Sequence, residues 1–343
     1  MKIHQKCLSF NDVLLTPQKS NIGSRKEINI GASLNSSHYS LPVISSPMDT
    51  VTEVCMADTI YSAGGLGILH RYNSINEQTK LVRDLSALGV PNISAAIGVS
   101  GDTEDRATAL YDAGARTLCI DIAHGHHVLM EKALKALRDI FGESVTLIAG
   151  NVATPAAFLD LQSWGADAIR VGIGGGSICS TRTQTGHGLS TLSSIMACSK
   201  VKTAAKLIAD GGIKNSGDIV KAIAAGADFV MLGSLLAGTD ESPGDVFLST
   251  DGKRYKAYRG MASRAAQMDW RGKISSLEGV STTIPYKGPV KHILNELAIN
   301  IRSGFSYSGA RNQAELRDLA IFVQQSPASQ LESSTHILGT RDV

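Results

Sequence analysis

The sequence predicts an α/β protein whose 343 residues form one (β/α)8 TIM barrel domain. The first observation is a weak internal repeat, because Asp112–Asp121, Ser163–Gly172 and Ala224–Gly233 share one pattern. Each begins as a helix end, passes through a glycine where left-handed φ is favourable, and continues as a short apolar run. Ser62–His70 is a looser copy. Such a run is typical of a parallel strand buried on both faces.

The second observation is the number and order of the expected elements. In chain order, the expected strands are Val43–Ser46, the apolar end of Ser62–His70, Ser94–Val99, the apolar end of Asp112–Asp121, Val145–Ala149, the apolar end of Ser163–Gly172, Lys206–Ala209 and the apolar end of Ala224–Gly233. Amphipathic helices are expected between them, most clearly Val128–Phe141 and Ser216–Ala225. Strands that alternate with helices predict a parallel sheet, and eight units favour a closed barrel over an open sheet.

Polar residues and glycines follow most of the expected strands, where the active sites of such barrels are built. They are Asp49, His70, Asp121, Asn151, Gly172, Asp210 and Gly233. A single Asp or Asn at such a place is more often a turn or a helix cap. Seven of these residues on one rim favour a functional site.

Composition limits the classes of function. The formal net charge of +2 gives no electrostatic reason to expect a nucleic-acid or membrane partner. No apolar run approaches the roughly 20 residues of a membrane span, and the N-terminus lacks an apolar signal core. The cysteines are odd in number and scattered, at Cys7, Cys55, Cys119, Cys179 and Cys198. This pattern argues against disulfides and predicts a reducing, cytoplasmic location.

The most informative segment is the glycine-rich loop Gly172–Arg182, which carries Cys179. Hydroxyl groups and a cation surround this cysteine, at Ser177, Ser180, Thr181 and Arg182. Glycines allow the backbone to approach an anion closely, and a neighbouring cation raises the thiolate fraction of a thiol. The loop is therefore interpreted as a nucleophile beside a phosphate site. The alternative is a flexible linker with a chance cysteine, which would not need this cluster.

Seven segments in order along nearly the whole chain resemble the IMP dehydrogenase/GMP reductase family. They are Ser9–Pro17, Ser45–Glu53, Gly150–Thr154, Gly174–Arg182, Ala209–Ile213, Met231–Gly238 and Tyr258–Met261. Members of this family often carry a regulatory pair of domains after the second strand. Here Arg71–Asn92 is too short for that insert, which predicts a catalytic barrel alone.

The resemblance implies that Cys179 attacks C2 of a purine nucleoside monophosphate, with Thr181 and Glu278 as the other catalytic residues. It implies substrate contacts from Ser46, Met48, Ser177, Asp210, Gly212, Gly233, Ser234, Tyr258, Gly260, Met261 and Ala262. Within this set, Asp210 takes the ribose hydroxyls, Ser177, Gly212, Gly233, Ser234 and Tyr258 take the phosphate, and backbone groups near Met261 and Ala262 meet the charge that develops on the purine.

The resemblance also implies a dinucleotide side and a cation site. Asp121, Ala123, Asn151 and Arg182 are the expected dinucleotide contacts. The carbonyl groups of Gly174, Gly176 and Cys179 are the expected ligands of a monovalent cation such as K⁺, although Gly175 stands where relatives carry proline. Three histidines within Ala123–His127 raise a metal hypothesis, but no carboxylate pair completes a ligand shell.

Two reactions fit the family. A dehydrogenase oxidises IMP with NAD and needs a flap that activates water, usually through an Arg-Tyr pair. A reductase removes ammonia from GMP with NADPH and uses a Thr-Glu pair. The flap Ala262–Leu277 is short and holds no tyrosine, whereas Thr181 and Glu278 match the reductase. Dehydrogenase-like details are Ser46-Pro-Met, Tyr258-Arg-Gly-Met and Glu332–His336.

We therefore expect NADPH-dependent reductive deamination of GMP to IMP through a cysteine thioimidate. The alternatives are IMP dehydrogenase activity with NAD and nucleotide binding without catalysis. The family also implies a homotetramer. The polar tail at residues 326–343 is expected to be an irregular arm that reaches a neighbour.

Overall fold

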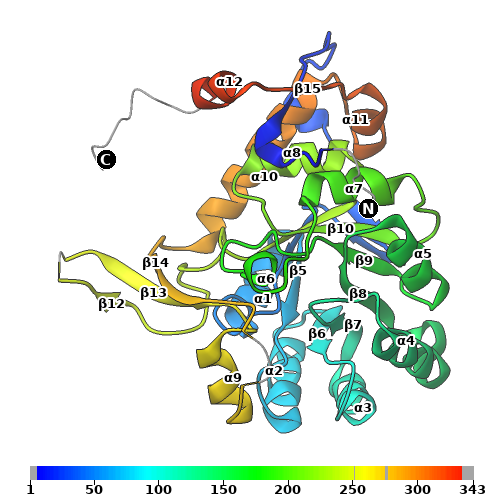
Figure 1. Cartoon of the computed structure of the whole chain (residues 1–343), viewed down its shortest axis with the longest axis vertical. Helices are drawn as coiled ribbons and strands as arrows, with labels where there is room; N and C mark the ends of the chain where they lie inside the picture. Colours follow the sequence, from blue (N-terminus) through cyan, green and yellow to red (C-terminus); the bar gives the residue numbers. More distant parts are fainter. Residues whose placement is uncertain (1–5, 251, 275–276, 334–343) are drawn as a thin grey trace.

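The computed structural model describes residues 6–250, 252–274 and 277–333, and it contains a closed barrel of eight parallel strands (Figure 1). The strands are β4 (Val43–Ser45), β5 (Leu66–Leu69), β6 (Ile93–Ile97), β7 (Ala115–Asp121), β8 (Thr146–Val152), β9 (Ala168–Val171), β10 (Lys206–Asp210) and β11 (Phe229–Leu232). They follow one another around the barrel in chain order, and β11 closes it by pairing with β4. The predicted fold class and all eight predicted strands are confirmed.

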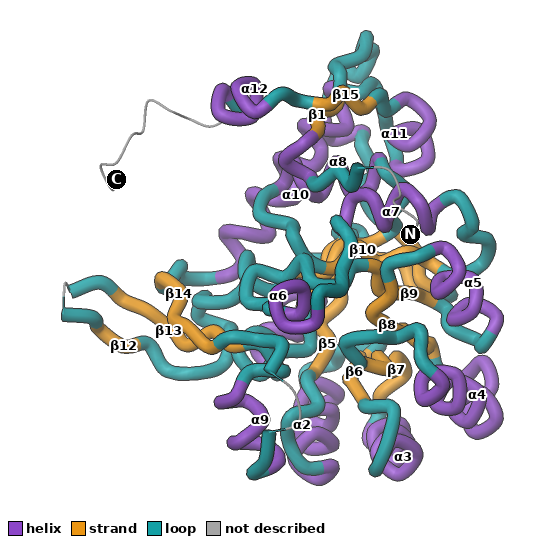
Figure 2. The backbone as a smooth tube through the Cα atoms, in the orientation of Figure 1, coloured by secondary structure: helices purple, strands orange, loops and turns teal. Residues whose placement is uncertain are grey.

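Helices surround the barrel, as the alternating pattern predicted (Figure 2). They are α1 (Val54–Ser62), α2 (Ile75–Ala87), α3 (Thr103–Ala113), α4 (Val128–Phe141), α5 (Pro155–Ser163), α7 (Thr191–Ser199), α8 (Ser216–Ala224) and α10 (Val290–Tyr307). A single helix, α2, connects β5 to β6, so this connection carries no inserted domain. No helix in the described part of the chain is long and apolar enough to cross a membrane.

Left-handed glycines connect helices to strands in the repeated units. Gly114, Gly165 and Gly226 have φ values of 118°, 104° and 116°. A Cβ atom at Gly226 would lie 2.3 Å from the Cβ of Ser199, so steric crowding adds to the conformational requirement there. These glycines allow each chain segment to turn sharply into a buried strand.

Side chains from the strands fill the barrel interior, so the barrel is not an open pore. Ile68, Cys119, Ile148, Phe229 and Met231 belong to this inner cluster, and each is at most 2% exposed. A second, larger apolar layer lies between the strands and the surrounding helices. The filled interior leaves the rim at the carboxyl ends of the strands as the place for a site.

Several elements lie outside the barrel. β1 (Val13–Leu15) pairs with β15 (Phe322–Gln324), β2 (Ala32–Leu34) pairs with β3 (Ser37–Tyr39), and β12 (Phe247–Leu248), β13 (Arg254–Arg259) and β14 (Ser281–Pro285) form a sheet that projects from the body (Figure 1). The remaining helices are α6 (Thr181–Thr185), α9 (Arg264–Arg271), α11 (Gln313–Leu319) and α12 (Pro327–Glu332).

Two segments differ from the sequence-based expectations. The flap contains the helix α9, which begins after Ser263 because this side chain accepts a hydrogen bond from the amide of Ala266. The tail is helical at Pro327–Glu332, where Ser326 caps the helix and Pro327 fits its first turn. The rest of the expected arm, from residue 334 onward, lies outside the described residues.

Candidate active site

The cysteine loop runs from the end of β9 to the start of α6. Two glycines in it have positive φ, at 147° for Gly172 and 77° for Gly174. A Cβ atom at Gly172 would lie 1.9 Å from the carbonyl oxygen of Asp210, so only glycine allows the two rim loops to touch. This close approach brings Cys179 over the same rim as Asp210.

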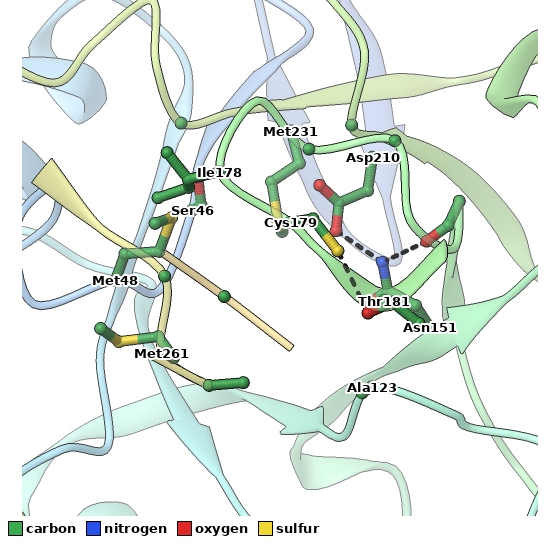
Figure 3. A pocket seen from close by; sticks show the side chains of 18 of the residues that line it. Ser46, Met48, Ala123, Asn151, Ile178, Cys179, Thr181, Asp210, Met231 and Met261 are labelled. Atoms are coloured by element: carbon green, nitrogen blue, oxygen red, sulfur yellow. Dashed lines mark hydrogen bonds between the residues drawn. The ribbon is translucent and has the colours of Figure 1, made fainter. Parts of the chain in front are cut away.

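Cys179 begins a chain of three hydrogen-bonded side chains. Its Sγ lies 3.2 Å from Oγ1 of Thr181, and this oxygen lies 2.8 Å from Oε2 of Glu278 (Figure 3 shows the first contact). Cys179 is exposed, whereas Thr181 is buried. The arrangement provides a path along which a proton can move between the space beside the thiol and a carboxylate.

Backbone pairing holds Glu278 in this position. The amide of Ser180 donates to the carbonyl oxygen of Glu278 at 2.8 Å, and the amide of Val280 donates to that of Ile178 at 3.0 Å. The segment after the flap therefore forms a short antiparallel pairing with the cysteine loop. Two loops that are about a hundred residues apart in the chain become one surface.

The two predicted carboxylates share a buried arginine. Arg170 donates to Oδ1 of Asp121 at 2.6 Å and to Oδ2 of Asp210 at 2.9 Å, and Asn151 donates to the same Oδ2 at 2.8 Å (Figure 3 shows the Asn151 contact). Among the described residues, no donor forms a hydrogen bond with the other oxygen of Asp210. That oxygen is available to a ligand hydroxyl group.

These ion pairs control the charge state of the site. Burial opposes the charge of Arg170, but the nearby carboxylates of Asp210 and Asp121 raise its pKa well above the usual value. Burial alone would raise the pKa of Asp121, yet Arg170 and Arg71 outweigh it and hold this pKa below its ordinary value. Both partners are therefore ionised at neutral pH.

A cavity of about 280 Å³ at the rim is lined by most of the predicted residues. Its lining includes Ser46, Met48, Asp121, Ala123, Asn151, Gly174, Gly176, Ser177, Cys179, Thr181, Asp210, Gly212, Gly233, Ser234, Tyr258, Gly260, Met261, Ala262 and Glu278. Every predicted site residue except Arg182 lines it. At the expected phosphate end, Oγ of Ser177 lies 3.3 Å from the hydroxyl oxygen of Tyr258.

Arg182 has a different place. Its Nη2 donates to the carbonyl oxygen of Leu189 at 2.6 Å and approaches that of Ile173 at 3.4 Å, so the side chain braces the cysteine loop. It lines a second cavity, described below. A dinucleotide contact from Arg182 therefore stays a prediction, and it now lacks a place in the main cavity.

The expected monovalent-cation site would use backbone carbonyl groups, so it is distinct from a metal site built from side chains. No group of three or more His, Cys, Asp or Glu side chains suited to a metal ion occurs within residues 6–250, 252–274 and 277–333. The carbonyl oxygen of Gly176 already accepts a hydrogen bond from the amide of Cys179 at 3.1 Å. Coordination of a monovalent cation by the loop carbonyls stays a prediction.

The residues of the cavity wall that sequence reasoning missed include Arg170, Arg71 and Tyr72. The signal for Arg170 was present, because a lone cation inside the apolar strand β9 needs buried anionic partners. The guanidinium carbon of Arg71 lies 5.2 Å from the ring centre of Tyr72 and 5.3 Å from that of Trp270. This stacking joins the flap helix α9 to the barrel rim, which no motif indicated.

Comparisons with known proteins agree with this geometry. A model of the IMP dehydrogenase/GMP reductase domain matches residues 7–336. A GMP reductase from Leishmania major is 33% identical, with 96% of each chain covered. An inosine-5′-monophosphate dehydrogenase from Nitrosopumilus maritimus is also 33% identical, with 96% of this chain and 98% of that protein covered.

Among solved structures, a GMP reductase variant from Trypanosoma brucei in complex with guanosine 5′-monophosphate superimposes with a TM-score of 0.92. It shares 31% sequence identity, and the match covers 97% of this chain and 98% of the other. Fold, rim cavity and matched residues lead to one conclusion: this chain belongs to the IMP dehydrogenase/GMP reductase family of oxidoreductases.

Proposed function

We propose that this protein is a GMP reductase that converts GMP to IMP and ammonia with NADPH. The observation that carries the proposal is the hydrogen-bonded series Cys179–Thr181–Glu278. Loss of ammonia from C2 requires a proton at the departing nitrogen. Thr181 and Glu278 lie beside the nucleophile, where they can deliver that proton.

The proposed reaction has two stages. In the first, the Cys179 thiolate attacks C2 of GMP, the C2–N bond breaks, and the amine leaves as ammonia after accepting a proton through Thr181 from Glu278. In the second, a bound NADPH would supply a hydride to C2; as the C2–S bond breaks, IMP leaves and the Cys179 thiolate is restored. Asp121, Ala123 and Asn151, which line the cavity, are the residues that we propose to hold the nicotinamide.

The cavity also supports the substrate class. The family uses a nicotinamide cofactor and a purine nucleotide, and the Trypanosoma brucei relative binds guanosine 5′-monophosphate. A free oxygen of Asp210 and the small residues Gly212, Gly233 and Ser234 fit a ribose and a phosphate. The preference for NADPH over NADH, a loop-bound K⁺, a homotetramer and a cytoplasmic location are further parts of this proposal.

IMP oxidation is the competing function, because a relative with that name is equally similar. Hydrolysis of the thioimidate that forms during IMP oxidation needs a base or a polarising group beside the attacking water. Residues 262–277 contain no tyrosine, and the candidate groups there are Arg264, Arg271 and Lys273. Of these three candidates, Arg264 is exposed. The lack of a water-activating pair favours reduction.

Thiol labelling tests covalent catalysis separately from reaction direction. Alkylation of Cys179, followed by peptide mass spectrometry, is expected to slow strongly in the presence of GMP. Cys55 is also exposed and serves as an internal control whose labelling stays unchanged. Binding of GMP without protection of Cys179 would instead support the non-catalytic alternative.

A further inference from the structure

A second cavity, of about 320 Å³, lies directly behind the proposed phosphate site. Gly175, Ser177, Gly212, Ile213 and Ser234 line both this cavity and the main one. The proposed phosphate residues Ser177, Gly212 and Ser234 therefore form the boundary between the two cavities. The inference below rests on the proposed nucleotide site.

The outer wall of this second cavity is built from the start of the chain. Leu8 is held at the N-terminus of α7 by hydrogen bonds with Ser190 and Ser193. Nζ of Lys221 donates to the carbonyl oxygen of Phe10 at 2.9 Å, and Nζ of Lys214 donates to Oδ1 of Asn11 at 3.2 Å. The cavity therefore has a fixed wall.

The electrostatic character of the cavity is cationic. Arg182 and Lys214 line it, and no described residue of its lining carries a carboxylate. Neither cation forms an ion pair within the described part of the chain, although Asp218, outside the lining, accepts a hydrogen bond from the backbone amide of Lys214 at 3.0 Å. A cavity lined by two positive groups and no acid favours an anion, even though both side chains are exposed.

The N-terminus of α7 opens on the same cavity. This nine-residue helix lacks a side-chain cap, and the hydroxyl group of its N-cap residue, Ser190, donates to the carbonyl oxygen of Leu8. Thr191, the first residue of the helix, lines the cavity and is 4% exposed, and its Oγ1 has no hydrogen-bond partner among the described residues. Uncapped helix amides and an unpartnered buried hydroxyl both suit the oxygens of a phosphate.

We propose that this second cavity, defined by Arg182, Lys214 and Thr191, binds a second phosphoryl group beyond the 5′-phosphate of the nucleotide. The group can belong to a nucleoside diphosphate or be free inorganic phosphate beside the bound monophosphate. Both sources present the same oxygens to the same cations. The protein is therefore expected to accept additional negative charge at the 5′ end of the bound nucleotide, which a closed monophosphate site would reject.

Calorimetric titration of the full chain at constant ionic strength tests this proposal. The ligands are GMP, GDP, and GMP in the presence of excess inorganic phosphate. GDP is expected to bind within about tenfold of GMP if the second group is linked to the nucleotide, a difference of at most ~1.4 kcal/mol. If the group is free phosphate, phosphate is expected to tighten GMP binding instead.

A matched pair of lysine variants distinguishes the effect of removing a charge from the cavity from the effect of loosening the cavity wall. Lys214→Met is expected to weaken the GDP or phosphate effect about three- to tenfold while leaving GMP affinity unchanged within about twofold. Lys221→Met loosens the same wall but removes no cavity charge, so it is expected to have less effect. Equal losses in both variants would overturn the assignment of charge to Lys214.

Two further outcomes are decisive. GDP binding about a hundredfold weaker than GMP, together with no effect of phosphate on GMP affinity, would overturn the second site while leaving the proposed function intact. Failure of GMP itself to bind would contradict the proposed function and, with it, the inference.

Discussion

Thr181 donates its hydroxyl hydrogen to Glu278 at 2.8 Å, across 97 positions of the sequence. The same oxygen of Thr181 lies 3.2 Å from the Sγ of Cys179. One hydroxyl group therefore joins the nucleophile to a carboxylate. The pairing of the segment after the flap with the cysteine loop makes this contact possible, so the flap region contributes to the site even without a tyrosine.

Removal of the nucleophile is expected to separate turnover from binding. Cys179→Ala should lower kcat by ~10³-fold or more, because no other group can form the thioimidate. GMP binding should persist, since the proposed ribose and phosphate contacts come from other loops. Steady-state assays and calorimetry measure the two effects. A residual rate above about 1% of the parent would reject covalent catalysis.

The relay is tested by Glu278→Gln, which keeps an acceptor for Thr181 but removes the exchangeable proton of the carboxyl group. The kcat for GMP reduction is expected to fall roughly 10²- to 10⁴-fold, the usual contribution of general acid catalysis. Thr181→Val should have a similar effect, whereas Thr181→Ser should retain most activity. Full activity of the Gln variant would show that protons reach ammonia by another route.

Asp210 is expected to recognise the ribose. Asp210→Ala should weaken GMP binding by about 2–4 kcal/mol, because charged hydrogen bonds to two hydroxyl groups are lost. This carboxylate also pairs with Arg170, so part of any loss can be structural. The preference for GMP over its 2′-deoxy analogue distinguishes the roles. If the variant keeps the parent's full preference, Asp210 is not the sugar ligand.

Acid stability reports on Asp121. Its pKa is lower in the folded protein than the ordinary value of about 4, so its stabilising effect is complete above that pH and is lost as pH falls through the folded pKa. Asp121→Asn should lower the free energy of unfolding by about 1–3 kcal/mol at neutral pH. Urea titrations across the acidic range should show that the free energy of unfolding falls less steeply with decreasing pH in the variant than in the parent. Parallel curves for the two proteins would contradict this account.

The fold and most of the site follow from local patterns in the sequence. Glycines such as Gly165 mark most passages from helix to strand, and the site residues Asp121 and Asp210 directly end barrel strands. Once eight strands are parallel and closed, their carboxyl ends must share one rim. The position of these residues in the cavity was therefore predictable without knowledge of their contacts.

What the sequence did not predict depends on side-chain packing between distant elements. The family resemblance implies a dinucleotide contact from Arg182, and no local pattern indicated that its side chain donates to the carbonyl oxygen of Leu189. The stacking of Trp270 on Arg71 likewise has no local pattern. Such contacts depend on how loops approach one another in space, and spacing along the chain does not encode them.

The reaction direction tests the central claim most directly. Purified protein should be assayed in parallel for NADPH loss with GMP and for NADH gain with IMP and NAD, with nucleotide products separated by chromatography. The account predicts multiple turnovers of GMP to IMP with equal release of ammonia, and at most slow, stalled adduct formation with IMP. Steady production of XMP from IMP, at a rate above that of GMP reduction, would contradict it.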